Sequence, residues 1–324
     1  MTKILDCTIR DGGHLNDWNF SKEFVKSAYE TAAKSRVDFF EIGYRRKNPP
    51  QNFGEFSRCN DEFLFNLISQ NPNCKLSLMI DAGKSDLNDF KPFKNDLTPI
   101  SFVRVSTYPD KLETAFELCE GLLERNYGVF LNLMAVSEFK KQDYEKLEKW
   151  EPKSFLESVY FADSFGSFLP DDIEKFYTIL KNIGIEKISF HSHNNLQLAF
   201  ANTLKALELN FYSVDATIFG MGRGAGNLPI ELLLGYLQKQ NYEKYNPVFY
   251  LEFIEKNLAE MKKYSNWGYT IPHVIGGLKN IHPNYTEELA EKKYSFAEIL
   301  KISDLLKNEK LISYNKNKIR EILK

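Results

Sequence analysis

The chain has 324 residues and a formal net charge of −2, with 43% hydrophobic and 27% charged residues. This composition is typical of a folded globular protein and excludes a disordered chain, and the small net charge gives no basis for a nucleic-acid partner or a membrane surface. No apolar run approaches the ~20 residues of a membrane span, and no signal peptide is recognisable, so we expect a cytoplasmic protein. Its four cysteines are widely spaced, and we expect them to be free thiols.

Short β-rich runs alternate with amphipathic helical stretches over the first 240 residues. In chain order, strands are predicted at residues 3–7, 38–44, 75–81, 102–107, 128–134, 158–164, 187–193 and 214–220. Helices are predicted at residues 22–35, from about 61, briefly after the third strand, and at 111–126, 138–150, 171–184, 196–210 and 228–240. Apolar strands separated by helices indicate parallel pairing with both sheet faces covered. The eight units could form an open doubly wound sheet, but no G-x-G-x-x-G follows the first strand, so an α/β fold of the (β/α)8 TIM-barrel type is predicted.

The alternation of strands and helices stops after residue 240. Residues 246–264 have a helical pattern, and so does the rest of the chain apart from the Gly/Pro-rich stretch 267–285, which interrupts it. Two domains are therefore predicted: a catalytic TIM barrel over residues 1–240 and a helical C-terminal domain over residues 241–324.

Polar residues gather where the predicted strands end. In a parallel barrel the active site lies at the C-terminal ends of the strands. The polar residues at these ends are Arg10, Asp11, His14, Glu41, Tyr44, Arg45, Asp81, Arg104, Ser106, Asn132, Asp163, Ser164, His191, His193, Asp215, Thr217 and Asn227.

Two histidines on one strand suggest a metal site. His191 and His193 are two residues apart, so on a strand their side chains point the same way from backbone positions roughly 6.6 Å apart. With a carboxylate from Asp11, they would suit a catalytic Mn²⁺, Mg²⁺, Zn²⁺ or Co²⁺ ion. The alternatives are a polar strand end for the histidines, a turn or helix cap for Asp11 in "RDGG", and a tight turn for "GRGAGN".

Four motifs carry a resemblance to a known group of enzymes. "LDCTIRDGGH", "ADSFG", "FHSHNN" and "GMGRGAGNLPIELL" occur in this order along the chain. Together they resemble the metal-dependent TIM-barrel lyases and Claisen-condensing enzymes, a group that includes hydroxymethylglutaryl-CoA lyase and the isopropylmalate, citramalate and homocitrate synthases. A histidine three residues after Asp11 and the "GAGN" loop are most similar to the 4-hydroxy-2-oxovalerate aldolase branch.

The resemblance implies a role for each matching residue. Trp18 departs from the aldolase pattern, which usually has a histidine or small polar residues there, and this bears on the aldehyde partner. The resemblance implies that Asp11, His191 and His193 are metal ligands, with Asn227 as a further candidate ligand. It implies that Arg10 binds the substrate and stabilises an enolate, and that His14 is the acid–base group. Two looser assignments are Tyr269 to catalysis and Ser164 to substrate binding.

The predicted function is that of a divalent-metal-dependent, class II aldolase. It would make or cleave a 4-hydroxy-2-oxo acid with pyruvate as the enolate half, with Mn²⁺ as the expected metal and an aldehyde as the second small-molecule reactant. A Claisen-type acyltransferase or lyase using acetyl-CoA is the alternative within enzymes, and a non-catalytic barrel scaffold is the alternative outside them. An aldehyde dehydrogenase partner or a homo-oligomer would also fit the resemblance.

Overall fold

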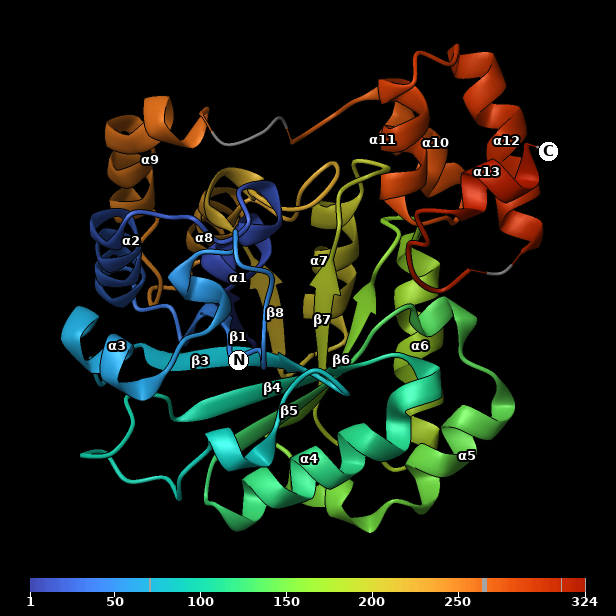
Figure 1. The fold of residues 1–324 in the computed structure, drawn as a ribbon. Coiled ribbons are helices and arrows are strands. Elements are labelled where there is room, and N and C mark those ends of the chain that lie inside the picture. Colours follow the sequence, from blue (N-terminus) through green and yellow to red (C-terminus); the bar gives the residue numbers. More distant parts are fainter. Residues whose placement is uncertain (70, 264–266, 310, 324) are drawn as a thin grey trace.

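The computed structural model describes residues 1–69, 71–263, 267–309 and 311–323. Its centre is a closed barrel in which each strand pairs in parallel with the next and the last pairs with the first (Figure 1). The strands are β1 (Lys3–Asp6), β2 (Phe39–Tyr44), β3 (Lys75–Asp81), β4 (Phe102–Thr107), β5 (Gly128–Leu133), β6 (Ser158–Asp163), β7 (Ile188–Ser192) and β8 (Ser213–Ala216). The predicted TIM barrel is confirmed.

Helices follow the strands, and most of those before residue 262 cover the outside of the barrel (Figure 1). They are α1 (Thr8–Gly12), α2 (Lys22–Lys34), α3 (Asp61–Leu67), α4 (Leu112–Glu124), α5 (Lys141–Lys149), α6 (Pro170–Asn182), α7 (Ala199–Glu208), α8 (Ile230–Lys239), α9 (Val248–Met261), α10 (Ile271–Lys279), α11 (Pro283–Glu291), α12 (Phe296–Asn308) and α13 (Lys318–Ile322). No helix among the described residues is long and apolar enough to cross a membrane.

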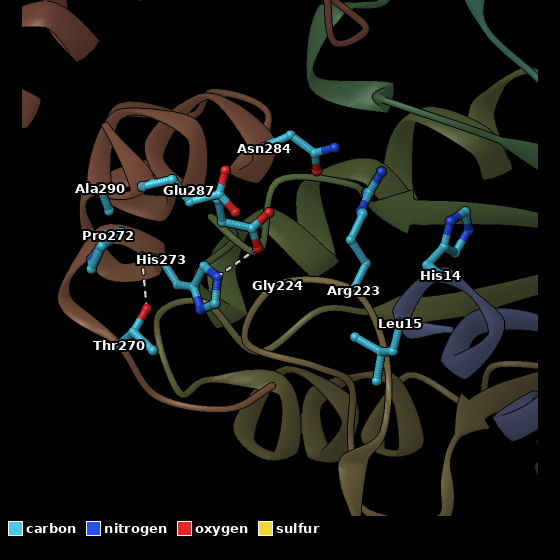
Figure 2. A pocket seen from close by; sticks show the side chains of 11 residues that line it. His14, Leu15, Arg223, Gly224, Thr270, Pro272, His273, Asn284, Glu287 and Ala290 are labelled. Carbon is cyan, nitrogen blue, oxygen red and sulfur yellow. Dashed lines mark hydrogen bonds and ion pairs between the residues drawn. The ribbon is translucent and has the colours of Figure 1, made fainter. Parts of the chain in front are cut away.

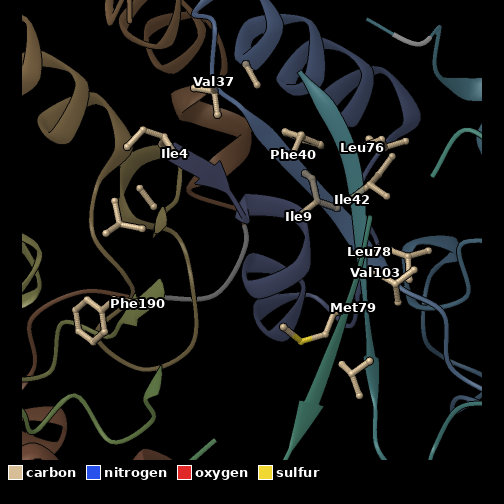
Figure 3. Close-up of a cluster of buried hydrophobic side chains, with 14 of the residues drawn as sticks. Ile4, Ile9, Val37, Phe40, Ile42, Leu76, Leu78, Met79, Val103 and Phe190 are labelled. Atoms are coloured by element: carbon tan, nitrogen blue, oxygen red, sulfur yellow. The ribbon is translucent and has the colours of Figure 1, made fainter. Parts of the chain in front are cut away.

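Alternation along the strands separates the barrel interior from its helix-covered outside. Figure 3 shows part of the outward set, in which Phe40 and Ile42 of β2 pack with apolar side chains of the neighbouring strands. Phe39 on the same strand points inward and contacts Phe102 and Phe130 at ring distances of 5.0 and 5.4 Å. These rings belong to an apolar cluster at the N-terminal end of the barrel interior.

Charged side chains lie two residues further along three of the strands, on the inside of the barrel. Phe39 is followed inside by Glu41, Phe102 by Arg104, and the inward Ser213 by Asp215; Glu41 and Arg104 are fully buried and Asp215 is 2% exposed. An apolar plug therefore closes the N-terminal end of the barrel, and the charged side chains lie above it, toward the C-terminal mouth.

The C-terminal helices are divided between two hydrophobic clusters. Helix α9 packs on α2, where Phe253 contacts Phe24 at 5.2 Å, and it belongs to the barrel's main cluster. Helices α10 to α13 share a second cluster and lie over the mouth beside β6 and β7 (Figure 1). The division predicted after residue 240 stays a prediction; from this packing we propose that the helical unit begins with α10.

The Gly/Pro-rich stretch 267–285 is largely helical, so the predicted interruption is wrong in this respect. Pro272 and Pro283 occupy the first turns of α10 and α11, where a missing backbone N–H costs no hydrogen bond. Gly277 lets α10 approach the barrel, because a Cβ there would lie 2.9 Å from Leu196 and 3.1 Å from the Gly166 carbonyl oxygen. The prolines begin helices here, and the glycine allows close packing.

Candidate active site

The short helix α1 carries two charged residues directly into the barrel mouth. Arg10 and Asp11 are 4% and 2% exposed, and Arg10 Nη1 lies 2.7 Å from Asp11 Oδ1. Burial alone would raise the pKa of Asp11, but the Arg10 charge and the nearby histidines hold it well below its usual range. Asp11 is therefore a buried carboxylate in its ionised form. The turn expected after the first strand is this helix, and Asp11 faces the mouth from it.

The glycine loop after β8 closes around the same carboxylate. The Asn227 side-chain amide donates to Asp11 Oδ2 and, at 3.1 Å, to the Met221 carbonyl oxygen. A Cβ on Gly222 would lie 2.1 Å from Asn227 Nδ2 and 2.6 Å from Asp11 Oδ2, so only glycine fits there. This loop thus holds Asn227 against Asp11, and Asn227 Oδ1 is left buried without a hydrogen-bond partner.

His191 of β7 and His193, which follows directly after the strand, meet Asp11 at the mouth. His191 and His193 have ring centroids 4.9 Å apart, and one ligand atom from each lies within 4.8 Å of the others and of an Asp11 oxygen. Burial lowers the pKa of His193 well below its usual value, which favours the neutral imidazole that binds metals. The three predicted ligands are therefore brought together, although their role as ligands stays a prediction.

His191 is oriented by a carboxylate behind it. Its Nδ1 lies 2.8 Å from Asp215 Oδ2, and burial would raise the pKa of Asp215, but Arg104 and His191 lower it. The ionised carboxylate can only accept, so His191 donates from Nδ1, and Nε2 is the ring nitrogen left for the site. Nε2 is buried and has no partner in the described structure, as expected of a ligand atom held by such a carboxylate.

A buried ionic network lies beneath the site. Arg104 reaches Glu41 Oε1 at 2.7 Å and Asp215 Oδ2 at 2.6 Å, and Arg10 Nε reaches Glu41 Oε2 at 2.6 Å. Glu41, Arg104 and Asp215 were recognised in the sequence as polar strand-end residues without a role. Their shared role is to fix the orientation of Arg10 and His191, and the one sequence signal for it was an arginine inside the apolar strand 102–107.

A second group of candidate ligands, Cys7, His191 and Asp215, lies deeper in the barrel. Burial raises the pKa of the Cys7 thiol well above its usual value, and both Arg104 and His191 already occupy Asp215 Oδ2. A thiol that stays protonated is a poor ligand. The group containing Asp11 is therefore the better candidate for a divalent ion.

Three cavities meet at His14. One of about 170 Å³ occupies the barrel mouth and is lined by Arg10, Asp11, His191 and His193. A second, of about 550 Å³, extends toward the helical unit, where Figure 2 shows Arg223 and His14 across from Glu287. The third, of about 770 Å³, extends along the loops after β2 and β3. His14 thus borders all three cavities, and a molecule that extends from the mouth cavity into either of the others lies close to it.

His14 presents an exposed ring to these cavities but is crowded by protein atoms and cations. This desolvation, together with Arg223, Arg46 and Arg10, lowers the pKa of His14 below its usual value against the opposing effect of Asp11. The ring is therefore neutral near pH 7 and can accept a proton. Its edge lies against Trp18, with the ring centroids 4.7 Å apart.

Tyr269 and Ser164, the two looser assignments, do not line the mouth cavity. Tyr269 is 63% exposed. Ser164 is buried, and its Oγ accepts a hydrogen bond of 2.8 Å from the backbone N–H of Ala135. Of the cations that line this cavity, Lys84, Lys111 and Arg223 were not singled out in the sequence. Arg46 belongs to "YRRKN" at residues 44–48, which the sequence offers either as a segment that binds an anionic substrate group or as a solvated loop. Arg45 of the same segment points away to Asp61.

Comparisons with known proteins agree with the resemblance read from the motifs. Residues 140–254 match the HMGL-like family model. The chain is 25% identical over 242 residues to an oxaloacetate decarboxylase of Mycobacterium tuberculosis, and 29% identical over 247 residues to a 4-hydroxy-2-oxovalerate aldolase of Carboxydothermus hydrogenoformans. The alignments cover 74% of this chain in both cases and 70% and 72% of the relatives.

A solved structure shows the same architecture over nearly the whole chain. It is the N-terminal domain of an aldolase candidate from Bacteroides vulgatus, with a TM-score of 0.82 and 28% sequence identity. The match covers 92% of this chain and 99% of that domain. The barrel together with the helices after it is therefore an arrangement that another protein shares.

Proposed function

We propose that this chain, with its HMGL-like segment, is a divalent-metal-dependent aldolase that makes or cleaves a 4-hydroxy-2-oxo acid. The observation that carries the proposal is the grouping of Asp11, His191 and His193 within 4.8 Å, beside Arg10, at the catalytic end of the barrel. Relatives named as lyases of 2-oxo acids support it. Mn²⁺ as the metal, pyruvate as the enolate half and a cytoplasmic location belong to the same proposal.

The residues present fit a divalent cation. Asp11 offers an ionised oxygen, His191 an unpartnered Nε2 and Asn227 an unpartnered Oδ1. A cation held by Asp11, His191 and His193 would supply Lewis acidity toward the keto and carboxylate oxygens of a 2-oxo acid. The donor set of one carboxylate and two imidazoles leaves positions open for such a substrate.

Arg10 and His14 would act on different parts of the substrate, the enolate and the C4 hydroxyl. Arg10 Nη2 is buried and has no hydrogen-bond partner, so it can donate to the oxygen on which negative charge develops in the enolate. Neutral His14 accepts the proton of the C4 hydroxyl while the C3–C4 bond breaks. The electron pair of that bond stays on the pyruvate half, and the aldehyde leaves into the cavities that border His14.

The test is exchange of the pyruvate methyl protons with deuterium, followed by proton NMR with saturating Mg²⁺, beside an assay of pyruvate release from 4-hydroxy-2-oxo acids. Arg10→Ala should lower exchange and cleavage by ~10²-fold, because both pass through the enolate. His14→Ala should lower cleavage much more than exchange. Arg58→Ala, which removes an exposed arginine outside the mouth cavity, should change neither.

The outcomes separate the proposal from its alternatives. Absence of exchange with every divalent ion tried would refute the enolate chemistry, and release of coenzyme A from acetyl-CoA with a 2-oxo acid, without aldol cleavage, would show the acyltransferase reading to be right. If His14→Ala abolishes exchange but leaves cleavage intact, the role of His14 is wrong.

The relative from Mycobacterium tuberculosis favours one second candidate, decarboxylation of a 2-oxo diacid. Loss of CO2 from oxaloacetate leaves the same pyruvate enolate and requires no base for a C4 hydroxyl. Arg10→Ala would therefore impair this reaction while His14→Ala would not. Pyruvate release from oxaloacetate, corrected for the metal-dependent reaction without protein, distinguishes the two.

A further inference from the structure

Three cations follow three consecutive strands at the barrel mouth. Arg46 comes after β2, Lys84 after β3 and Lys111 after β4, and all three line the cavity that contains the candidate metal ligands. These strands are neighbours and parallel, so their C-terminal ends form one continuous rim. Asp11 follows β1, whereas His191 and His193 lie at the C-terminal end of β7, on the far side of the mouth from β3.

This positive charge is not balanced by the protein. The mouth cavity is lined by five Lys or Arg residues but by two carboxylates, Asp11 and Asp81. Asp81 is already engaged, since Ser106 donates to Oδ1 at 2.7 Å and Arg46 approaches Oδ2 at 3.4 Å. Within the described parts of the chain, Lys84 and Lys111 form no ion pair. An arrangement of free cations in a concave site favours a negatively charged ligand.

Arg46 is held in place for such a contact. Its guanidinium lies 3.7 Å from the ring centre of Tyr44 and 4.2 Å from that of Trp18. Trp18 has a left-handed backbone with φ of 59°, unusual for a bulky residue, and its indole donates to the Arg10 carbonyl oxygen at 3.0 Å. The rings fix the plane of the guanidinium, so less side-chain freedom is lost when Arg46 binds an anion.

The direction in which a substrate extends follows from volume and charge. The mouth cavity, at about 170 Å³, is smaller than the cavities of about 550 and 770 Å³ that share His14 with it, so a substrate that outgrows the mouth cavity extends into one of these. The 770 Å³ cavity shares His14, Arg46 and Lys84 with it. The 550 Å³ cavity is lined by two carboxylates, Glu287 and Glu291, against one arginine, Arg223, and is therefore less favourable for an anion.

We propose that the aldehyde half of the substrate carries an anionic group, a phosphate or a carboxylate, that binds Arg46, Lys84 and Lys111 on the β2–β4 rim. This inference rests on the proposed aldolase function and names the substrate class of that same site. The 2-oxo acid end would lie at Asp11 and the two histidines, and the anionic end would lie across the mouth.

The experiment compares anionic aldehydes with matched neutral ones in the aldol addition to pyruvate. The pairs are glyceraldehyde 3-phosphate against glyceraldehyde, and succinic semialdehyde against butanal. We expect kcat/KM at least ~10-fold higher for the anionic member of one pair, the effect of about one charge-assisted hydrogen bond. Preference within the first pair identifies a phosphate, and preference within the second a carboxylate.

Variants then locate the preference. Lys84→Met, Lys111→Met and Arg46→Met should each reduce the anionic-to-neutral ratio of kcat/KM by several-fold or more. The two lysines are exposed, so their variants keep the test valid if Arg46→Met disturbs packing against Trp18. Lys141→Met removes a lysine whose side chain is 91% exposed on α5 and should leave the ratio unchanged.

Two results would overturn the inference: no preference in either pair, or a preference that Lys84→Met and Lys111→Met leave intact. Exchange of pyruvate methyl protons without any aldehyde keeps this failure distinct from failure of the proposed function. If exchange proceeds and no anionic preference exists, only the present inference is wrong. If exchange is absent, the aldolase proposal fails and this inference falls with it.

Discussion

The charged groups at the barrel mouth form two regions that are built in opposite ways. The buried network beneath the candidate site joins Arg10, Glu41, Arg104 and Asp215, and Arg10 and Asp215 each contact at least two oppositely charged or hydrogen-bonding partners. On the exposed rim after β3 and β4, Lys84 and Lys111 have no ion pair within the described residues. The network is organised by the protein itself, and the rim is available to a ligand.

The buried network would preorganise the catalytic groups, and the exposed lysines would determine substrate specificity. A buried network costs desolvation and is retained where orientation matters, here for Arg10 and His191. Exposed lysines are free to adjust to the ligand that arrives. We therefore expect changes in the buried network to alter catalysis and stability, and changes on the exposed rim to alter substrate preference alone. The predictions below test this division.

The largest effect is expected from removing a candidate ligand. His193→Ala leaves one imidazole and one carboxylate, a poor chelate, so turnover should fall ~10³-fold or more and metal affinity by several kcal/mol. Titration calorimetry with Mn²⁺ measures the affinity. His273→Ala is the matched control, because His273 is equally buried but pairs with Glu287 in the helical unit. Near-normal turnover of His193→Ala after treatment with EDTA would contradict the ligand assignment.

Breaking the buried network should cost stability. Arg104→Met leaves Glu41 and Asp215 buried with fewer partners, and we expect a loss of ~3–5 kcal/mol in the free energy of unfolding. Lys84→Met, which also removes one positive charge from a long side chain, should cost less than about 0.5 kcal/mol. Urea titrations of both variants give the comparison. Equal losses would show that the buried network and the exposed rim do not differ as described.

A smaller effect is expected from the carboxylate behind His191. Asp215→Asn keeps the size of the side chain but weakens its hold on His191 Nδ1, so metal affinity should fall ~10–100-fold. Some stability should also be lost, because Arg104 contacts the same carboxylate oxygen at 2.6 Å. The measurement that isolates the positioning role is metal affinity at a temperature where the variant is fully folded. Unchanged affinity would mean that Asp215 serves Arg104 alone.

The sequence predicted the architecture and the candidate ligands because both follow local rules. Strand–helix alternation fixes the barrel, and the spacing of His191 and His193 places them on one face of a strand. The C-terminal ends of parallel strands lie at one end of the barrel, which is why Asp11 could be matched with residues 180 positions away. Periodicity and motif order were sufficient for these features.

Other features depended on how side chains meet across the barrel. Nothing local indicates that Arg46 rather than Arg45 faces the cavity; an irregularity of the β2–β3 register, where Gly43 has φ of 143°, redirects the chain there. A Cβ on Gly43 would lie 2.1 Å from the Phe56 carbonyl oxygen, so the loop 45–58 determines this bend. The pairing of Glu41 with Arg104 and Arg10 likewise requires three-dimensional packing.

The smallest predicted effect concerns a buried carboxyl that belongs to neither region. Asp163 at the end of β6 accepts hydrogen bonds from the backbone N–H groups of Ser167 and Phe168, at 2.8 and 3.1 Å. Burial nevertheless raises the pKa of Asp163 to about 7, against an ordinary value of 3.8. Between these two values the folded chain holds a proton that the unfolded chain has released, so this group's contribution to stability is largest below pH 4 and declines as the pH rises toward 7.

Asp163→Asn removes that titration and keeps most of the side-chain shape. The free energy of unfolding of the variant, relative to the parent, should therefore rise between pH 4 and pH 7 by about 3 kcal/mol. Asp171→Asn, a change of the same kind on α6 in the first turn, is the matched control and should show no such trend. Urea titrations across this range measure the difference. A constant difference would show that Asp163 stays ionised and that its two backbone hydrogen bonds outweigh its burial.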